Sequence, residues 1–237
     1  NHDKNGHGTI VASVASNSKN NGNGRFHGVA PDSAIVPVQV LDEEGVGRYS
    51  DVIDGIGWAI EHKDEYNIRV MNLSLSAPVR SWYWDDPLNQ AVMRAWQAGI
   101  VVVVAAGNDG PDPMSVGVPG NVPYVITVGA VGDGDTPEDW SDDVIPEFSA
   151  AGPTVEAFVK PDVLAPGGHL KAPMEIHDPI AVDHLEFHDV YDYFTMSGTS
   201  QATAVASGVV ALMLQANPGL TPDEVKFRLM YSARPAL

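Results

Sequence analysis

The chain has 237 residues, of which 44% are hydrophobic, and this suits one compact domain with a sizeable core. Its formal net charge of −18 disfavours partners such as nucleic acid or an anionic membrane surface. The lack of cysteine excludes disulfides, thiol nucleophiles and thiolate metal sites, and no apolar run reaches the length of a membrane span.

Predicted helices and strands alternate from the start of the chain. Residues 5–15 indicate a glycine-flanked turn that enters a short helix, with His7 at its start. Residues 17–28 form a polar, glycine-rich loop, which is either a plain surface loop or a source of oxygen ligands for Ca²⁺. Residues 33–41 predict a buried strand, and Ser50 is expected to cap the following helix.

The middle of the chain carries the strongest strand signals. Apolar runs of strand length occupy residues 68–75, 100–106, 124–131 and 162–165. Between the first two runs, Pro87 at a helix start and Gly99 at its end mark a helix. The run at 100–106 is almost continuously apolar, as expected for a parallel strand covered on both faces.

Two helices close the chain. Within residues 194–214, a Gly-Thr-Ser turn runs into a predicted buried helix of small apolar residues, with Ser200 in its first turn. Thr221, Pro222 and Glu224 form a capping box at the start of the next helix. The alternation of strands and helices predicts an α/β fold, a three-layer sandwich with a mostly parallel sheet and helices on both faces. In such sheets, ligands bind at the carboxyl ends of the strands.

Three polar residues fall where strands end or helices begin: His7, Asn108 and Ser200. A serine hydroxyl becomes a nucleophile when a base such as imidazole takes its proton, and a side-chain amide can stabilise the resulting oxyanion. Each residue also has an ordinary explanation. His7 could be a surface or capping histidine, Asn108 a turn residue and Ser200 an N-cap, and spacing alone does not bring them together.

Seven motifs, in order, carry a resemblance to a known family. They are NGHGTIVASVA, GVAPDSAIVPVQVLDEEGVGRYS, NLSLS, VVVAAGNDG, VPGNVPYVITVGAV, KPDVLAPG and MSGTSQATAVASG. Together they resemble the subtilisin family of serine peptidases, from about residue 5 to residue 232. The resemblance implies that His7 is the general base, Ser200 the nucleophile, and Asn108 the oxyanion donor beside the Ser200 backbone N–H.

The same resemblance implies a substrate cleft that holds an extended polypeptide as an added strand. One side would be formed by Gly45, Val46 and Gly47, and the other by Ser74, Leu75 and Ser76. The wall of the primary pocket would be Ala105, Ala106 and Gly107, with residues 118–120 at its base. These small, apolar walls favour an apolar or aromatic side chain before the cut.

The family's catalytic Asp has no counterpart in this chain, since Asp-Thr-Gly and Asp-Ser-Gly motifs are absent upstream of His7. Asp3 lies too close to His7 to replace it. We therefore expect a single subtilisin-like domain over residues 1–237 that lacks its N-terminal segment, with a cleaved or separate segment supplying the Asp. The alternatives are an inactive fragment or pseudoenzyme that binds extended peptides, and an acyl enzyme that favours ligation.

Further departures from the family pattern are Ile10 in place of His, Ser76 in place of Gly, and Ala204 in place of Pro. Ile10 and Ala204 are expected to change packing only, whereas Ser76 could narrow the cleft. Two acidic inserts, 132–147 and 167–193, are expected to be solvated loops rather than metal sites. The second leads into Ser200, and it could border the leaving-group side of the cleft and disfavour acidic substrates.

The resemblance also implies accessory properties. Ca²⁺ is expected as a structural ion, at positions that the sequence does not give, and no catalytic cofactor is expected. Family members are typically secreted, which predicts an extracellular protein, with a cytoplasmic location as the alternative. Polypeptides are the expected substrates, without nucleic acid or membrane partners.

Overall fold

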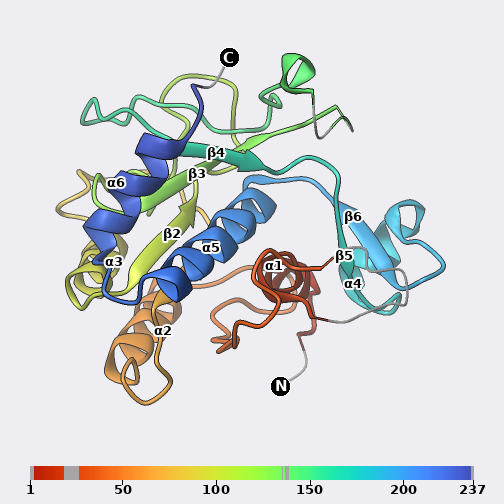
Figure 1. The fold of residues 1–237 in the computed structure, drawn as a ribbon, viewed down its shortest axis with the longest axis horizontal. Coiled ribbons are helices and arrows are strands. Elements are labelled where there is room, and N and C mark those ends of the chain that lie inside the picture. Colours follow the sequence, from red (N-terminus) through yellow and green to blue (C-terminus); the bar gives the residue numbers. More distant parts are fainter. Residues whose placement is uncertain (1–2, 19–26, 135, 137–138, 236–237) are drawn as a thin grey trace.

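A computed structural model describes residues 3–18, 27–134, 136 and 139–235 (Figure 1). At its centre lies a sheet of four strands in the order β1 (Val70–Leu73), β2 (Val101–Ala105), β3 (Ile126–Val131) and β4 (Val163–Pro166). All three pairings are parallel, with Val70 opposite Val101 and Ala130 opposite Ala165. Every residue of β2 is buried, as its run of valines predicts.

Helices cover the sheet on both faces (Figure 1). The long helix α5 (Thr199–Ala216) crosses all four strands, whereas α3 (Pro87–Gln97) and α6 (Pro222–Ser232) pack against β2, with α2 (Tyr49–Glu61) against α3. The Asp86 carboxylate caps α3, and the predicted capping box at the start of α6 is formed.

Smaller elements lie beyond α5, on its side away from the sheet (Figure 1). The helix α1 (His7–Ser16) packs along α5 and against the antiparallel hairpin of β5 (Leu170–Pro173) and β6 (Tyr193–Met196). Between these two strands lie α4 (Pro179–Asp183) and the 3₁₀ helix η2 (Leu185–Phe187), and a second 3₁₀ helix, η1 (Trp140–Asp142), lies in the first acidic insert.

The described apolar side chains form two main clusters that meet at α5. The larger one, which we call the sheet core, contains the strands together with Ala202, Ala206 and Val210 of α5. The smaller one, which we call the α1 cluster, contains Ile10 and the opposite face of α5 at Ala204. The helix that carries Ser200 therefore presents small residues of its own to both clusters, which allows the neighbouring elements to approach closely.

The predicted α/β fold is confirmed, and so are the four strands and the helices around 87–99 and after Thr221, with slightly shorter bounds. Two predictions are wrong. Residues 33–41 form no strand and none of them is buried, because no described strand pairs with them. Ser50 lies inside α2, where Arg48 is the N-cap residue without a side-chain cap bond. The predicted loop 17–28 lies mostly outside the described residues.

The second acidic insert is more ordered than a solvated loop. Its ends form the β5–β6 hairpin, and Met174 and Ala181 are buried in the α1 cluster. The first insert fits the prediction better, since η1 is exposed and Gly132 forms one isolated bridge with Val144.

Candidate active site

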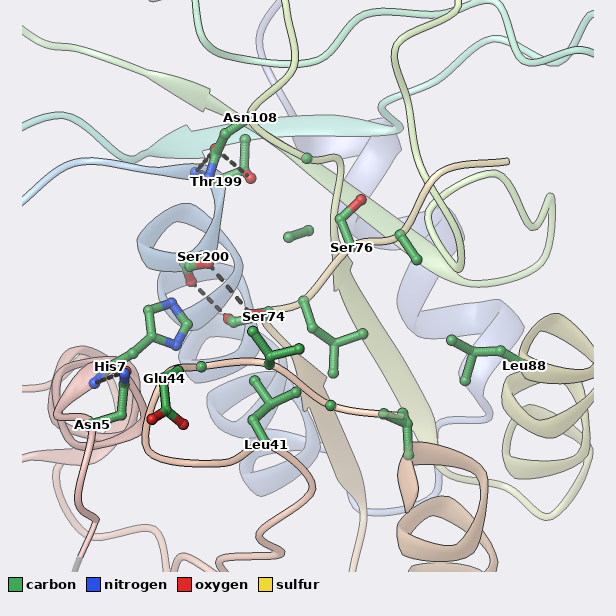
Figure 2. Close-up of a pocket in the computed structure, with 18 of the residues that line it drawn as sticks. Asn5, His7, Leu41, Glu44, Ser74, Ser76, Leu88, Asn108, Thr199 and Ser200 are labelled. Carbon is green, nitrogen blue, oxygen red and sulfur yellow. Dashed lines mark hydrogen bonds between the residues drawn. The ribbon is translucent and has the colours of Figure 1, made fainter. Parts of the chain in front are cut away.

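A cleft of ≈ 690 Å³ opens at the carboxyl ends of β1 and β2 (Figure 2). It is lined by His7, Asn108 and Ser200, so these three residues, which are distant in sequence, share one surface. Eight of the nine predicted substrate-binding residues also line it: Gly45, Val46, Gly47, Ser74, Leu75, Ser76, Ala105 and Gly107. The ninth, Ala106, is fully buried against Val116 and Ala150.

Ser200 lies in the first turn of α5 and is 8% exposed. Its Oγ donates a long bond of 3.5 Å to the Ser74 carbonyl, and the Ser74 hydroxyl donates to the Ser200 carbonyl at 2.9 Å. Behind Ser74, the Asn72 amide and the Ser207 hydroxyl continue the chain of hydrogen bonds. The end of β1 therefore fixes the start of α5, where backbone N–H groups remain available to an anion.

The amide of Asn108 has a defined orientation. Its Oδ1 accepts bonds from the Thr199 backbone N–H at 3.0 Å and from the Thr199 hydroxyl at 2.9 Å (Figure 2). Because the oxygen is occupied, Nδ2 is the group that Asn108 can offer to a ligand beside Ser200. The sequence reasoning did not single out Thr199, although its place between Gly198 and Ser200 was a signal.

His7 is the first residue of α1, and Asp3 supplies the cap that Gly6 lacks. The Asp3 carboxylate accepts bonds from the backbone N–H groups of Asn5, Gly6 and Thr9. Burial raises the pKa of Asp3, but these hydrogen bonds outweigh it, so that the pKa lies below its ordinary value. Asp3 thus serves the helix rather than the imidazole.

The His7 imidazole is held less firmly than the other two side chains. Its ring faces Ser200 across the cleft (Figure 2), but among the described residues no hydrogen bond joins the ring to Ser200 or to a carboxylate. Burial lowers the pKa of His7, and the nearby charge of Asp3 opposes this effect. The neutral imidazole, which can accept a proton, is therefore favoured.

The two predicted substrate-binding segments differ in exposure, since residues 45–47 are exposed whereas Ser74 and Leu75 are only partly exposed. Gly45 lies in a turn that the Asp42 carboxylate closes by accepting the Val46 N–H at 2.8 Å. Gly45 has a positive φ of 77° in this turn. On the opposite side, Ser76 fills space in the pocket. A Cβ added at Gly107 would lie 3.2 Å from Ser76 Oγ, and one at Gly117 would lie 2.1 Å from it.

Two further lining residues, Asn5 and Ile180, were not expected from the sequence. The Asn5 side chain donates to the Glu43 carbonyl at 2.9 Å and accepts the His7 N–H at 3.3 Å. The backbone carbonyl of Asn5 accepts the backbone N–H of Ile180 at 3.5 Å. Asn5 could have been predicted to line the cleft because it lies only two residues before His7, whereas nothing in the sequence indicated that Ile180 lies here.

In the part of the chain that the structure describes, no three His, Asp or Glu side chains come together as a metal site. Within it, no helix is both long and apolar enough to cross a bilayer.

Comparison with known proteins gives a consistent result. Residues 1–236 match the sequence model of the subtilase family. The chain is 42% identical over 233 residues to serine protease AprX of Bacillus subtilis (strain 168), covering 95% of this chain and 52% of that protein. It is 36% identical to subtilisin of Bacillus pumilus, covering 98% of this chain and 71% of the relative.

Solved structures agree with the sequence matches. Sphericase superposes with a TM-score of 0.79 at 25% identity, covering 98% of this chain and 70% of that one. A cold adapted subtilisin-like serine proteinase gives a TM-score of 0.74 at 33% identity, covering 98% and 69%. The chain spans about half the length of some curated relatives, such as AprX.

Proposed function

This chain belongs to the subtilase family, and from that membership we propose that it is a serine endopeptidase, a hydrolase that cleaves peptide bonds in proteins through an acyl-enzyme intermediate. One observation carries the proposal beyond family membership. His7, Asn108 and Ser200 line the same cleft, with the Asn108 amide oriented by Thr199. This set of groups matches the needs of acyl transfer.

The proposed chemistry gives each of the three groups a separate role. The His7 imidazole takes the proton of the Ser200 hydroxyl as Oγ attacks the substrate carbonyl. The negative charge on the carbonyl oxygen is stabilised by Asn108 Nδ2 and the backbone N–H of Ser200 at the start of α5. His7 then gives its proton to the departing amine, and water repeats the sequence to release the acyl group as a carboxylic acid.

We further propose that a cleaved or separate N-terminal segment supplies the carboxylate that orients His7. Two features support this. Among the described residues no carboxylate contacts the His7 ring, and β1 is the terminal strand of the sheet, so its outer edge can pair with another strand. Residues 33–41, which read as a strand in sequence but pair with no strand among the described residues, fit the same explanation.

The proposed substrates are extended polypeptides, which would add a strand between residues 45–47 and 74–76 of the cleft. The small walls at Ala105 and Gly107 favour an apolar side chain before the cut. A net charge of −18 supports the proposal that nucleic acid and anionic membranes are not partners. The whole of residues 1–237 is proposed to act as one domain, because α5 packs against both apolar clusters.

Ca²⁺ as a structural ion and secretion remain proposals from family membership. No group of three or more His, Asp or Glu side chains among the described residues could hold a metal ion. The proposed mechanism assigns no step to Ca²⁺. One relative is named extracellular serine proteinase, which supports secretion, with a cytoplasmic location as the alternative. A melting temperature measured with Ca²⁺ and with a chelator tests the first, and fractionation of the host culture tests the second.

The decisive experiment is intact mass spectrometry of the protein purified from its host, before and after a fluorophosphonate that acylates activated serines. We expect one adduct on Ser200, together with a second polypeptide that carries the carboxylate. The variant Ser200→Ala is the control and should take up no label. The absence of any adduct on Ser200 in the protein from its host would contradict the peptidase assignment and favour a peptide-binding pseudoenzyme.

A further inference from the structure

The segment between β5 and β6, residues 174–192, is built into the protein next to the cleft. Met174 and Ala181 are buried in the α1 cluster together with Ile10, and Asp178 at the start of α4 is also buried. Gly6, which precedes His7, has a positive φ of 96°, and a Cβ there would lie 3.1 Å from both Asp178 and Met174. This close packing fixes α4 relative to the start of α1.

One side chain of this segment reaches the cleft. Ile180 lines it together with His7 and Ser200, and its backbone N–H donates to the Asn5 carbonyl at 3.5 Å. Ile180 is only partly buried, since it packs on the edge of the α1 cluster and keeps part of its surface in the cleft. It therefore presents an apolar surface beside the general base.

The position of Asn5 indicates which part of a substrate meets this surface. In Figure 2, Asn5 lies on the far side of His7 from Ser76. The 74–76 segment is the one that we propose to hold the residues before the cut. Chemistry gives the same direction, because His7 must hand its proton to the departing amine. The residue that carries this amine therefore lies next to His7, on the side of Asn5 and Ile180.

We propose that Ile180 forms the wall of the subsite for the first residue after the cut, and that it selects an apolar side chain there over an acidic one. The inference rests on the proposed peptidase function and adds a specificity-determining residue to it. Contact with Ile180 removes apolar surface from water, whereas a carboxylate placed there would lose its hydration without a partner.

The test measures how the acyl-enzyme divides between water and added amines. The protein from its host is acylated with a peptide ester, and leucinamide, glycinamide and aspartic acid amide compete with water. In the productive step, the amine nitrogen bonds to the acyl carbon, the bond from that carbon to Ser200 Oγ breaks, and His7 carries the amine proton to Oγ. The product ratio reports binding on the leaving-group side alone.

We expect Ile180→Ala to lower the preference for leucinamide over glycinamide by about 10-fold. Ile180→Lys should reverse the discrimination against aspartic acid amide. The matched control is Val182→Ala, because Val182 lies in the same helix, is 52% exposed and does not line the cleft. It should leave all ratios unchanged.

The outcomes separate the two proposals. If Ser200 is labelled by fluorophosphonate and the amine ratios do not move in Ile180→Ala, the role of Ile180 is wrong and the peptidase assignment stands. If the variant changes only the selectivity for residues before the cut, measured with a series of esters, Ile180 belongs to a different subsite and the proposal is overturned. Failure to label Ser200 at all would overturn both.

Discussion

The two apolar clusters hold the two halves of the candidate site with different firmness. Ser200 and Asn108 stand on the sheet core, where β2 is wholly buried, and each of the two residues is hydrogen-bonded to a neighbouring element. His7 stands on the smaller α1 cluster, and its ring has no hydrogen-bond partner among the described residues. This chain therefore preorganises the proposed nucleophile and oxyanion donors, whereas the proposed base depends on packing and, in our proposal, on a carboxylate from another segment.

The largest effect is expected in the sheet core, from Asp162→Ala. The Asp162 carboxylate pairs with Lys160 at 2.7 Å and Lys226 at 3.0 Å, and it and Lys160 are almost fully buried. Removing it leaves two ammonium groups without their anion, which should cost about 3–5 kcal/mol in unfolding free energy. Chemical denaturation measures this, and labelling of Ser200 per folded molecule should not change.

The matched control for that variant is Asp64→Ala, which removes an exposed partner of Lys63 and should have little effect on stability.

The buried Lys160, which pairs with Asp162, predicts that the stability of the protein depends on pH. Burial lowers the pKa of Lys160 to about 7, although Asp162 opposes it. Between that value and the ordinary pKa of 10.5, the unfolded chain binds the extra proton, so stability should rise with pH across this window. An unfolding free energy that does not change with pH across this window would contradict the lowered pKa of Lys160.

The next largest effect concerns the preorganised donors. Asn108→Asp keeps the oxygen that accepts from Thr199 but replaces the Nδ2 donor by an anionic oxygen. We expect kcat to fall by about 10²–10³-fold, the range for loss of one oxyanion donor in a subtilisin-type site, with little change in KM. Equal kcat for variant and parent, at equal stability, would show that Asn108 does not contact the oxyanion.

A pair of matched substitutions tests the comparison itself. Ile10 and Ile126 are both 0% exposed, the first in the α1 cluster and the second in the sheet core. Replacing either by Val should cost about 0.5–1.5 kcal/mol in unfolding free energy. Only Ile10→Val should also slow acylation of Ser200, since it loosens the helix that carries His7. Equal acylation rates would mean that the two clusters behave as one rigid body.

The charge state of His7 gives a smaller, pH-dependent effect. Because burial lowers its pKa, the neutral imidazole persists to lower pH than for a free histidine. In the chain without the carboxylate segment, the rate of Ser200 labelling should therefore fall as the pH is lowered, with a midpoint below pH 6.5. Adding the segment should move the midpoint upward, because an adjacent anion favours imidazolium. If the midpoint is the same with and without the segment, the result would argue against a carboxylate beside His7.

Local patterns in the sequence predicted much of this structure. The valine run of β2 and the capping box of α6 are signals contained within a few neighbouring residues, and both are confirmed. Residues 33–41 show the limit of such signals. Their apolar residues read as a strand, but a strand needs a neighbour to pair with, and the described residues provide none.

The details of the site required tertiary structure. The motifs gave His7, Asn108 and Ser200 as residue types suited to acyl transfer, but the orientation of the Asn108 amide depends on Thr199, 91 positions away. The position of Ile180 depends on how the β5–β6 hairpin packs against α1. Contacts of this kind join segments distant in sequence, and they follow from the packing of whole elements rather than from local periodicity.

The smallest expected effect concerns the primary pocket, on the preorganised side of the site. Ser76 Oγ lies over the glycines at 107 and 117, so Ser76→Gly should enlarge the space available to the side chain before the cut. We expect the ratio of kcat/KM for a substrate with Phe at that position to one with Ala to rise by about 5-fold. Because the change adds no contact to a substrate with Ala before the cut, kcat/KM for that substrate should stay near the parent value. A fall for both substrates would instead indicate that the 74–76 segment has lost its shape, and that Ser76 holds the cleft rather than limiting it.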